Sequence, residues 1–451
     1  MSTLLKNAKI ALPGAVRLES LDIEIGKGFI VNIGKNLHGE NEIDLSGCEI
    51  FPGAVDPHVH FDEPGFTERE DFYHGSCAAA SGGVTTVIDM PCTSVPPVIN
   101  LANFKTKLNV VRDKSVIDFG FFGGVSAQCF ESDFAHNMAD IAEHVLGYKT
   151  YFISGMDTFG HLSFDRFFEV LKAAKQLKRP VLLHAEDLQT VTRLEKIERE
   201  KGRDWMNYYR SRPEEAEFIA VQNAIELAEK AGASLHIVHI GTAEAAELLQ
   251  QTDLVTGETC PHYLQFSRDD LERIGGALKT APVVKSPANR ERLWELLIDG
   301  TIDFVTSDHA PAPASQKDTG SAWTDYSGIP GTGTLFPYLY SEGYVKRKMP
   351  LNRFLEIISA AAARRYGLFD RKGSIETGKH ADFVIVNPDK NYIVKGAEFF
   401  SKGKITPFEE MTFNGRVEKT IVRGNIVYDA EKGIAGKAGL GRFIITQPCE
   451  D

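Results

Sequence analysis

At residues 51–60 the chain reads FPGAVDPHVH, an apolar run that ends in two histidines. His58 and His60 are two residues apart, so on an extended segment both imidazoles project to the same side and can share one metal ion. Two histidines in a loop or in the core are the alternative. The surroundings of this run decide between the two interpretations.

Strand-like apolar runs alternate with helical segments from this point up to about residue 372. The expected strands are 51–55, 84–90, 116–122, 148–153, 180–184, 234–240, 253–259 and 303–307, and expected helices include 164–177 and 213–231. About eight βα units in roughly 320 residues is what a (β/α)8 TIM barrel needs. Residues 51–372 are therefore predicted to form an α/β barrel.

Short alternating runs with glycine turns stand at both ends of the chain and predict β-hairpins. They are 20–25 and 29–33 near the start, and 381–386, 391–394 and 420–428 near the end. Because the termini of a domain commonly lie close together, we expect residues 1–50 and 373–451 to form one small β-sandwich domain.

The composition excludes several classes of protein. With 50 Lys plus Arg against 62 acids, the net charge is −12, and no basic run favours nucleic acid or an anionic membrane. Lys6 and Lys9 interrupt the start before a signal-peptide core could form, so we expect a cytoplasmic protein with a small-molecule partner. The cysteines lack paired CxxC spacing and are predicted to be reduced thiols: Cys48, Cys77, Cys92, Cys129, Cys260 and Cys449.

Polar side chains recur where the predicted barrel strands end, the place where barrel enzymes carry their chemistry. His184 closes the fifth run, His239 closes the sixth and Asp308 follows the eighth. His236 lies three residues before His239 and faces the opposite way on a strand, so His239 is the predicted ligand. This recurrence favours the metal interpretation of the first histidine pair.

Asp308 and Lys149 both enter segments predicted to be buried. A carboxylate there needs a cation, and beside metal-bound hydroxide Asp308 could carry a proton to a leaving nitrogen; a helix-capping role is the alternative. Lys149 lies among aromatic residues on the fourth run. A buried lysine tends to lose its proton, and the neutral amine can add carbon dioxide to give a carbamate that bridges two metals. Pairing with an internal acid, or reaching the surface, is the alternative.

At these residues the chain resembles the amidohydrolase superfamily, in its cyclic-amide hydrolase branch of dihydroorotases, allantoinases, hydantoinases and dihydropyrimidinases. The resemblance runs from the N-terminal strands through 52–60 to Gly373-Ser-Ile-Glu-Thr-Gly-Lys-His-Ala-Asp-Phe383. It implies a barrel with a flanking β-sandwich, and two divalent metals, usually zinc, with cobalt, manganese or iron as alternatives. The implied ligands are His58, His60, the carboxylated Lys149, His184, His239 and Asp308.

The resemblance also implies the reaction. A hydroxide that bridges the two metals attacks the ring carbonyl of a cyclic amide or ureide, and Asp308 passes its proton to the leaving nitrogen. Asp62, Thr93, Ser327 and Gly328 are the implied substrate contacts. Family members are commonly dimers or tetramers, so a homo-oligomer is expected.

Several motifs bear on the choice of ring. Dihydroorotases typically have Arg, Asn and His where this chain has Asp62, Cys92 and Ala312, so an anionic ring would lose its arginine partner. Asp62-Glu-Pro-Gly65, Glu258-Thr-Cys-Pro-His-Tyr263 and Ala288-Asn-Arg-Glu291 resemble allantoinases. Phe66 and Arg69, in contrast, resemble dihydroorotases, and Ser327-Gly-Ile-Pro-Gly331 resembles the ring-binding loop of both groups.

The sequence thus favours an allantoinase-like hydrolase. Dihydroorotase and hydantoinase or dihydropyrimidinase are the alternatives within this class. A non-catalytic scaffold that has lost its metal ligands is the alternative from another class, and the presence of all six ligand-type residues argues against it.

Overall fold

The computed structural model describes residues 2–39 and 41–445 and contains the predicted (β/α)8 barrel. β8 and β9 are two parts of one barrel strand, and an isolated parallel bridge between Val59 and His309 joins the last strand segment to the first. The barrel strands are β6 (Ala54–Val59), β7 (Val84–Asp89), β8 (Asp118–Phe121), β9 (Gly123–Gly124), β10 (Tyr148–Tyr151), β11 (Val181–His184), β12 (Leu235–Ile237), β13 (Val255–Thr259) and β14 (Phe304–Val305).

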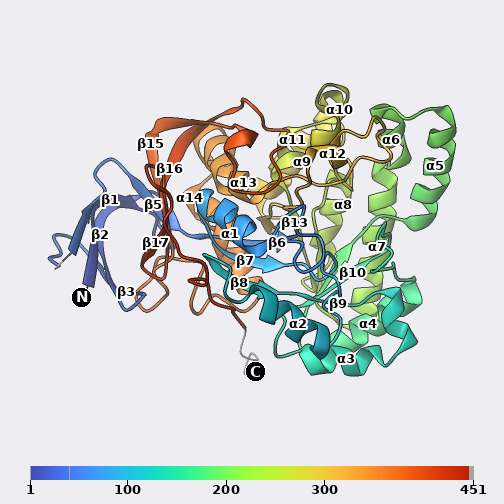
Figure 1. The fold of residues 1–451 in the computed structure, drawn as a ribbon, viewed down its shortest axis with the longest axis horizontal. Helices are drawn as coiled ribbons and strands as arrows, with labels where there is room; N and C mark the ends of the chain where they lie inside the picture. The colour runs from blue at the N-terminus through green and yellow to red at the C-terminus, as the bar shows by residue number, and fades with distance from the viewer. Residues whose placement is uncertain (1, 40, 446–451) are drawn as a thin grey trace.

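Strands from both ends of the chain lie side by side in one sheet, as the sequence predicts (Figure 1). The sheet order is β18-β17-β16-β15-β5-β1-β2-β3, with β4 beside β1, and the antiparallel pair of β15 and β5 joins the two halves. These strands are β1 (Ser2–Ile10), β2 (Glu19–Gly26), β3 (Phe29–Gly34), β4 (Asn41–Asp44), β5 (Glu49–Pro52), β15 (Phe383–Ile393), β16 (Thr412–Val422), β17 (Asn425–Asp429) and β18 (Gly433–Ile434).

The prediction for the first barrel strand was wrong at its start. The apolar run 51–55 spans two strands, because β5 belongs to the terminal sheet and β6 begins only at Ala54. Gly53 separates them, and a Cβ atom at this residue would lie 2.2 Å from the hydroxyl oxygen of Thr85. Both strands are buried, so the sequence pattern shows no break between them.

Helices surround the barrel (Figure 1). They are α1 (Phe72–Ser81), α2 (Leu101–Val111), α3 (Phe134–Ile141), α4 (Phe164–Gln176), α5 (Leu188–Lys201), α6 (Trp205–Ser211), α7 (Glu214–Ala231), α8 (Ala243–Glu247), α9 (Pro261–Gln265), α10 (Arg268–Ile274), α11 (Pro287–Asp299), α12 (Ala314–Lys317), α13 (Thr332–Tyr338), α14 (Leu351–Leu355) and α15 (Ala361–Arg365). The predicted helices 164–177 and 213–231 correspond to α4 and α7.

Helix α7 shows why such segments are helical. Alanines at four-residue spacing, from Ala216 to Ala228, are buried on one face. Acidic residues in its first turn and Lys230 in its last turn interact favourably with the helix dipole. Gly232 ends the helix in the left-handed conformation.

Of the six cysteines, five are free thiols, four of them buried, and Cys449 lies outside the described residues. Among the helices at residues 2–39 and 41–445, none is both long and apolar enough to cross a membrane.

A buried cluster of charges ties the barrel to the terminal sheet. The Lys372 ammonium lies 2.8 Å from Asp118, at the start of β8, and 2.6 Å from Asp382, just before β15. The Arg423 guanidinium also pairs with Asp118. Together with His380 the two acids lie close enough to hold a metal ion, but Lys372 and Arg423 already supply their positive charge.

Replacing Asp118 by alanine removes the shared partner of two buried cations. We expect D118A to lower the free energy of unfolding by about 3–5 kcal/mol, as for other broken buried ion pairs. E169Q is the control, because it breaks an exposed pair with Lys172 and is expected to cost less than about 1 kcal/mol. Urea denaturation followed by circular dichroism measures both, and equal effects would contradict the role of the cluster.

Candidate metal centre

Three of the predicted ligands meet at the mouth of the barrel. His58 lies on β6, His60 directly follows this strand, and Asp308 follows β14. Oδ1 of Asp308 lies 3.3 Å from Nε2 of His58 and 3.5 Å from Nε2 of His60. One donor atom from each residue lies within 4.8 Å of the others. Two imidazole nitrogens and one carboxylate oxygen form a donor set suited to zinc or a similar divalent ion.

The histidines around Asp308 favour the ionised form of its carboxyl group. Burial alone raises the pKa of its carboxyl, but His58, the hydrogen bond from His60 and His239 hold that pKa well below its usual range. A carboxylate that stays charged in this way is suited to bind a cation.

The backbone around the centre is held in unusual conformations. Asp62, His239 and Asp308 have left-handed φ angles of 54°, 38° and 46°. Such angles cost about 1–3 kcal/mol each and persist only where the surroundings enforce them. Next to Asp308, Asp56 holds the backbone in place. Its carboxylate accepts hydrogen bonds from the Ser307 amide (3.0 Å), the Ser307 hydroxyl (2.6 Å) and the Thr332 hydroxyl (2.8 Å).

His184 and His239 form a second pair next to the first. Nδ1 of His184, at the end of β11, lies 3.1 Å from Nε2 of His239, which follows β12. The rings of His239 and His58 are 5.3 Å apart between centroids. The two groups of donors are therefore adjacent, and the second pair can contribute to a second cation.

Lys149 points its amine into this region from β10. The side chain is fully buried, and within the described chain its Nζ atom has no hydrogen-bond partner. Burial lowers the pKa of this amine to about 8, although Glu258 and Asp308 oppose the shift. Neither alternative from the sequence, an ion pair with an internal acid or exposure at the surface, is seen. An orphaned buried amine of this kind fits a lysine that becomes a carbamate.

Two supporting acids were missed by the sequence reasoning. Glu258, on β13, lies 2.5 Å from the ring of His58, and Glu186 lies 3.0 Å from the ring of His184. Glu258 opens the motif 258–263 that resembles allantoinases, so its presence near the site was signalled, but its contact with a histidine was not.

Thr93, expected as a substrate contact, lies behind a predicted ligand. Its hydroxyl is 3.2 Å from Nδ1 of His60. Cys92 is 3.1 Å from the Tyr151 hydroxyl and 3.9 Å from the same His60 nitrogen. In this arrangement both side chains support the His60 ring.

Asp62 offers two free carboxyl oxygens next to the centre. The residue is fully buried, neither oxygen has a hydrogen-bond partner among the described residues, and burial raises the pKa of its carboxyl to about 8. Arg69 lies over the rings of Phe66 (4.7 Å) and Tyr326 (4.4 Å), and its Nε donates to Gln316 (2.9 Å).

Ser327 and Gly328 lie on a loop that two buried lysines hold. Lys317 donates to the backbone carbonyls of residues 326 (2.9 Å) and 328 (2.6 Å), and Lys279 donates to that of residue 325 (2.5 Å). Gly328 has φ 150°, and a Cβ atom there would lie 2.1 Å from the carbonyl oxygen of Ala310. The glycine thus lets this loop approach the segment that follows Asp308.

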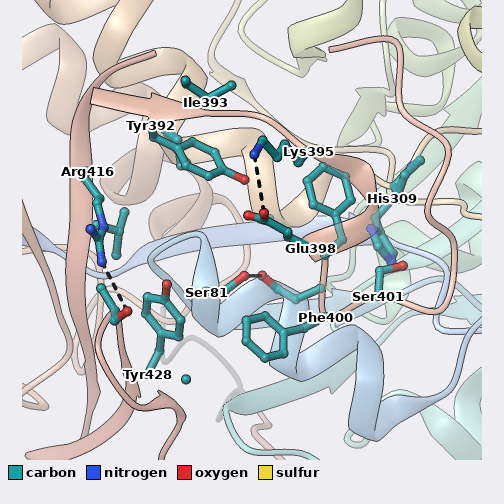
Figure 2. A pocket seen from close by; sticks show the side chains of 18 of the residues that line it. Ser81, His309, Tyr392, Ile393, Lys395, Glu398, Phe400, Ser401, Arg416 and Tyr428 are labelled. Atoms are coloured by element: carbon teal, nitrogen blue, oxygen red, sulfur yellow. Dashed lines mark hydrogen bonds and ion pairs between the residues drawn. The ribbon is translucent and has the colours of Figure 1, made fainter. Parts of the chain in front are cut away.

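A separate cavity of about 510 Å³ lies between the barrel and the terminal sheet, and none of the predicted site residues lines it. Figure 2 shows Tyr392, Lys395 and Glu398 on one side and His309 and Ser401 on the other. The Ser401 hydroxyl donates to Glu70 (2.6 Å), which also lies 3.2 Å from His309. This cavity therefore touches the neighbour of Asp308 but lacks the metal-binding donors.

Comparisons with known proteins agree with this arrangement. The model of the amidohydrolase family matches residues 50–427. An allantoinase of Rubrobacter xylanophilus is 37% identical over 438 residues, which cover 95% of each chain. An allantoinase of Deinococcus radiodurans is 35% identical over 435 residues, again with 95% of each chain covered.

A solved structure of an L-hydantoinase (dihydropyrimidinase) from Arthrobacter aurescens superimposes with a TM-score of 0.93 at 29% identity, and the match covers 99% of both chains. Similarity of sequence and of fold therefore extends over essentially the whole chain, with the His58, His60 and Asp308 cluster inside the matched region. The chain belongs to the amidohydrolase family.

Proposed function

We propose that this protein is an allantoinase-like hydrolase that opens the ring of a neutral cyclic ureide. Its cofactors in this proposal are two zinc ions and a carbamate on Lys149. The observation that carries the proposal is the convergence of His58, His60 and Asp308 on one point at the barrel mouth. Full-length similarity to allantoinases supports the substrate class.

The donors present fit two divalent ions. His58, His60 and Asp308 would hold one, His184 and His239 would contribute to the other, and the two oxygens of a Lys149 carbamate would reach both. Bound divalent ions lower the pKa of water and polarise a carbonyl group, which is the chemistry that amide hydrolysis needs.

Asp308 then moves the proton. In this proposal its carboxylate, which lies 3.3 Å from Nε2 of His58, accepts a proton from the attacking water. As the C–N bond of the ring breaks, the same carboxyl returns the proton to the departing amide nitrogen. Asp56 keeps Asp308 in place by fixing the backbone at Ser307.

Asp62 favours a neutral ring over an anionic one. Whether its buried carboxyl is protonated or accepts an N–H from the ring, it offers no positive charge to a ring carboxylate. Arg69 already lies between Phe66 and Tyr326. These contacts disfavour dihydroorotate as the substrate.

Hydantoin hydrolysis is the second candidate, because solved hydantoinases share the whole fold. Allantoin is itself a hydantoin that carries a ureido group, so one centre can open both rings. A scaffold role is disfavoured, because all six ligand-type side chains remain.

The first test is ring opening of allantoin, hydantoin, dihydrouracil and dihydroorotate by zinc-loaded protein. We expect allantoin to be the best substrate, and D308N to lower kcat at least about a hundredfold, because the proton carrier is lost. D113N, at an exposed aspartate, is the control. Near-normal turnover by D308N would refute the role of Asp308, and a zinc-loaded wild type that opens none of these rings would refute the function.

A second prediction concerns Asp62. Loss of a hydrogen bond to a charged or ionisable group costs about 1.5–3 kcal/mol, so D62N should lower kcat/KM for allantoin about tenfold or more. E68Q changes an exposed acid in the same segment and should leave kcat/KM unchanged. Steady-state kinetics measure this, and wild-type preference for dihydroorotate would contradict the argument.

A third prediction separates two buried lysines. With ¹³C-bicarbonate and zinc, the wild type should show a carbamate signal in the ¹³C NMR spectrum, and K149A should lose it. K317M should keep it, because Lys317, whose pKa burial also lowers, already donates to two backbone carbonyls. A signal that survives in K149A would rule out Lys149 as its source.

A further inference from the structure

Glu258 joins two histidines inside the barrel. Its Oε1 lies 2.5 Å from Nδ1 of His58 on β6, and its Oε2 lies 3.1 Å from Nε2 of His236 on β12. All three side chains are buried. An ionised carboxylate only accepts hydrogen bonds, so each of these ring nitrogens must carry a proton.

This contact fixes the His58 ring. With its proton on Nδ1, His58 presents Nε2, and this is the nitrogen that lies 3.3 Å from Asp308. His236 is fixed in turn, because its Nδ1 lies 2.7 Å from the Thr256 hydroxyl. His236 therefore supports Glu258 and is not a candidate metal ligand.

Glu186 does the same for His184 but selects the other nitrogen. Its Oε2 lies 3.0 Å from Nε2 of His184, so Nδ1 is left to face His239 at 3.1 Å. The same carboxylate oxygen is 2.5 Å from the Arg212 guanidinium. Among the described residues, Glu258 has no lysine or arginine within ion-pair distance, whereas Glu186 has Arg212.

We propose that Glu258 and Glu186 are positioning residues of the metal centre, and that each fixes the ring nitrogen which one histidine turns toward a cation. This inference rests on the proposed function and adds the residues that pre-orient its ligands. A carboxylate behind a metal-binding histidine fixes its tautomer and raises its basicity, and loss of such a partner typically lowers metal affinity about 10–100-fold.

The variants E258Q and E186Q test this directly. Glutamine keeps the size of the side chain but brings an NH2 group that cannot accept the histidine proton and turns the ring contact repulsive in one of its two orientations. E217Q is the matched control. Glu217 is equally buried and accepts from the Gly241 amide (2.9 Å), but no hydrogen bond or ion pair links it to a proposed ligand within the described chain.

Zinc retention is the readout, independent of turnover. Protein loaded with zinc is dialysed against graded concentrations of a chelator, and zinc per chain is measured by mass spectrometry. We expect E258Q and E186Q each to lose one of the two ions at about 10–100-fold lower chelator concentration, and the double variant to lose both. E217Q should behave like the wild type.

A further variant, E258D, separates position from charge. Aspartate keeps the charge but is one methylene shorter, so it cannot reach both histidines, and we expect zinc loss like that of E258Q. Circular dichroism confirms that each variant is folded.

The outcomes separate the two proposals. A wild type that binds no zinc overturns the proposed function. A wild type that binds two ions, with E258Q and E186Q retaining them as E217Q does, overturns only the positioning role. Full retention by E258D would show that charge alone suffices and would overturn the claim that Glu258 fixes the ring.

Discussion

The site depends on one constraint: the Asp308 carboxylate must stay ionised although its side chain is only 14% exposed. So little contact with water leaves most of the charge to be balanced by positive charge or hydrogen-bond donors from the protein or from a bound cation. These donors are His58 and His60, on and directly after β6, and His239, which follows β12, and the histidines of the site in turn need hydrogen-bond acceptors. Glu258 and Glu186 are those acceptors. The polar groups of the site therefore surround one carboxylate: histidines lie next to Asp308, and the two glutamates accept hydrogen bonds from histidines.

Much of the barrel follows from the sequence, because buried parallel strands are apolar runs and their ends are polar. This is why Val84–Asp89 and Val181–His184 were predicted closely. The error at Phe51 has the same origin, since two buried strands separated only by Gly53 look like one run. The predicted ligands were recognisable from the spacing of His58 and His60 and from their resemblance to a family. The contact of Glu258 with His58, 200 positions away, was not recognisable. It depends on which strands face each other once the barrel has closed, and this leaves no local pattern in the sequence.

The terminal sheet also takes part in the site. Lys372 and Arg423 hold it against the start of β8, whereas most of the predicted metal ligands lie at or after the ends of their strands. The segment after β15 reaches the other end, where Ser401 donates to Glu70, the acid that lies beside His309. His309 follows Asp308 directly and accepts from the Thr332 amide at 3.3 Å. Residues from the C-terminal part of the chain thus contact the barrel at both of its ends.

In the proposed function, the reaction and the choice of substrate depend on different parts of the structure. The donors that fit metals stand on strands or at strand ends, where neighbouring strands hold them, so any ring that reaches them meets the same chemistry. In the proposed function, the contacts that would distinguish one ring from another come from the segment 62–69 and the loop 323–328. That loop is held by Lys279 and Lys317 through backbone carbonyls, contacts that do not involve the side chains of residues 325 and 326. Substitutions in these two segments can therefore change the substrate while the centre is preserved, and this is why the family resemblance is strong for the reaction and mixed for the ring.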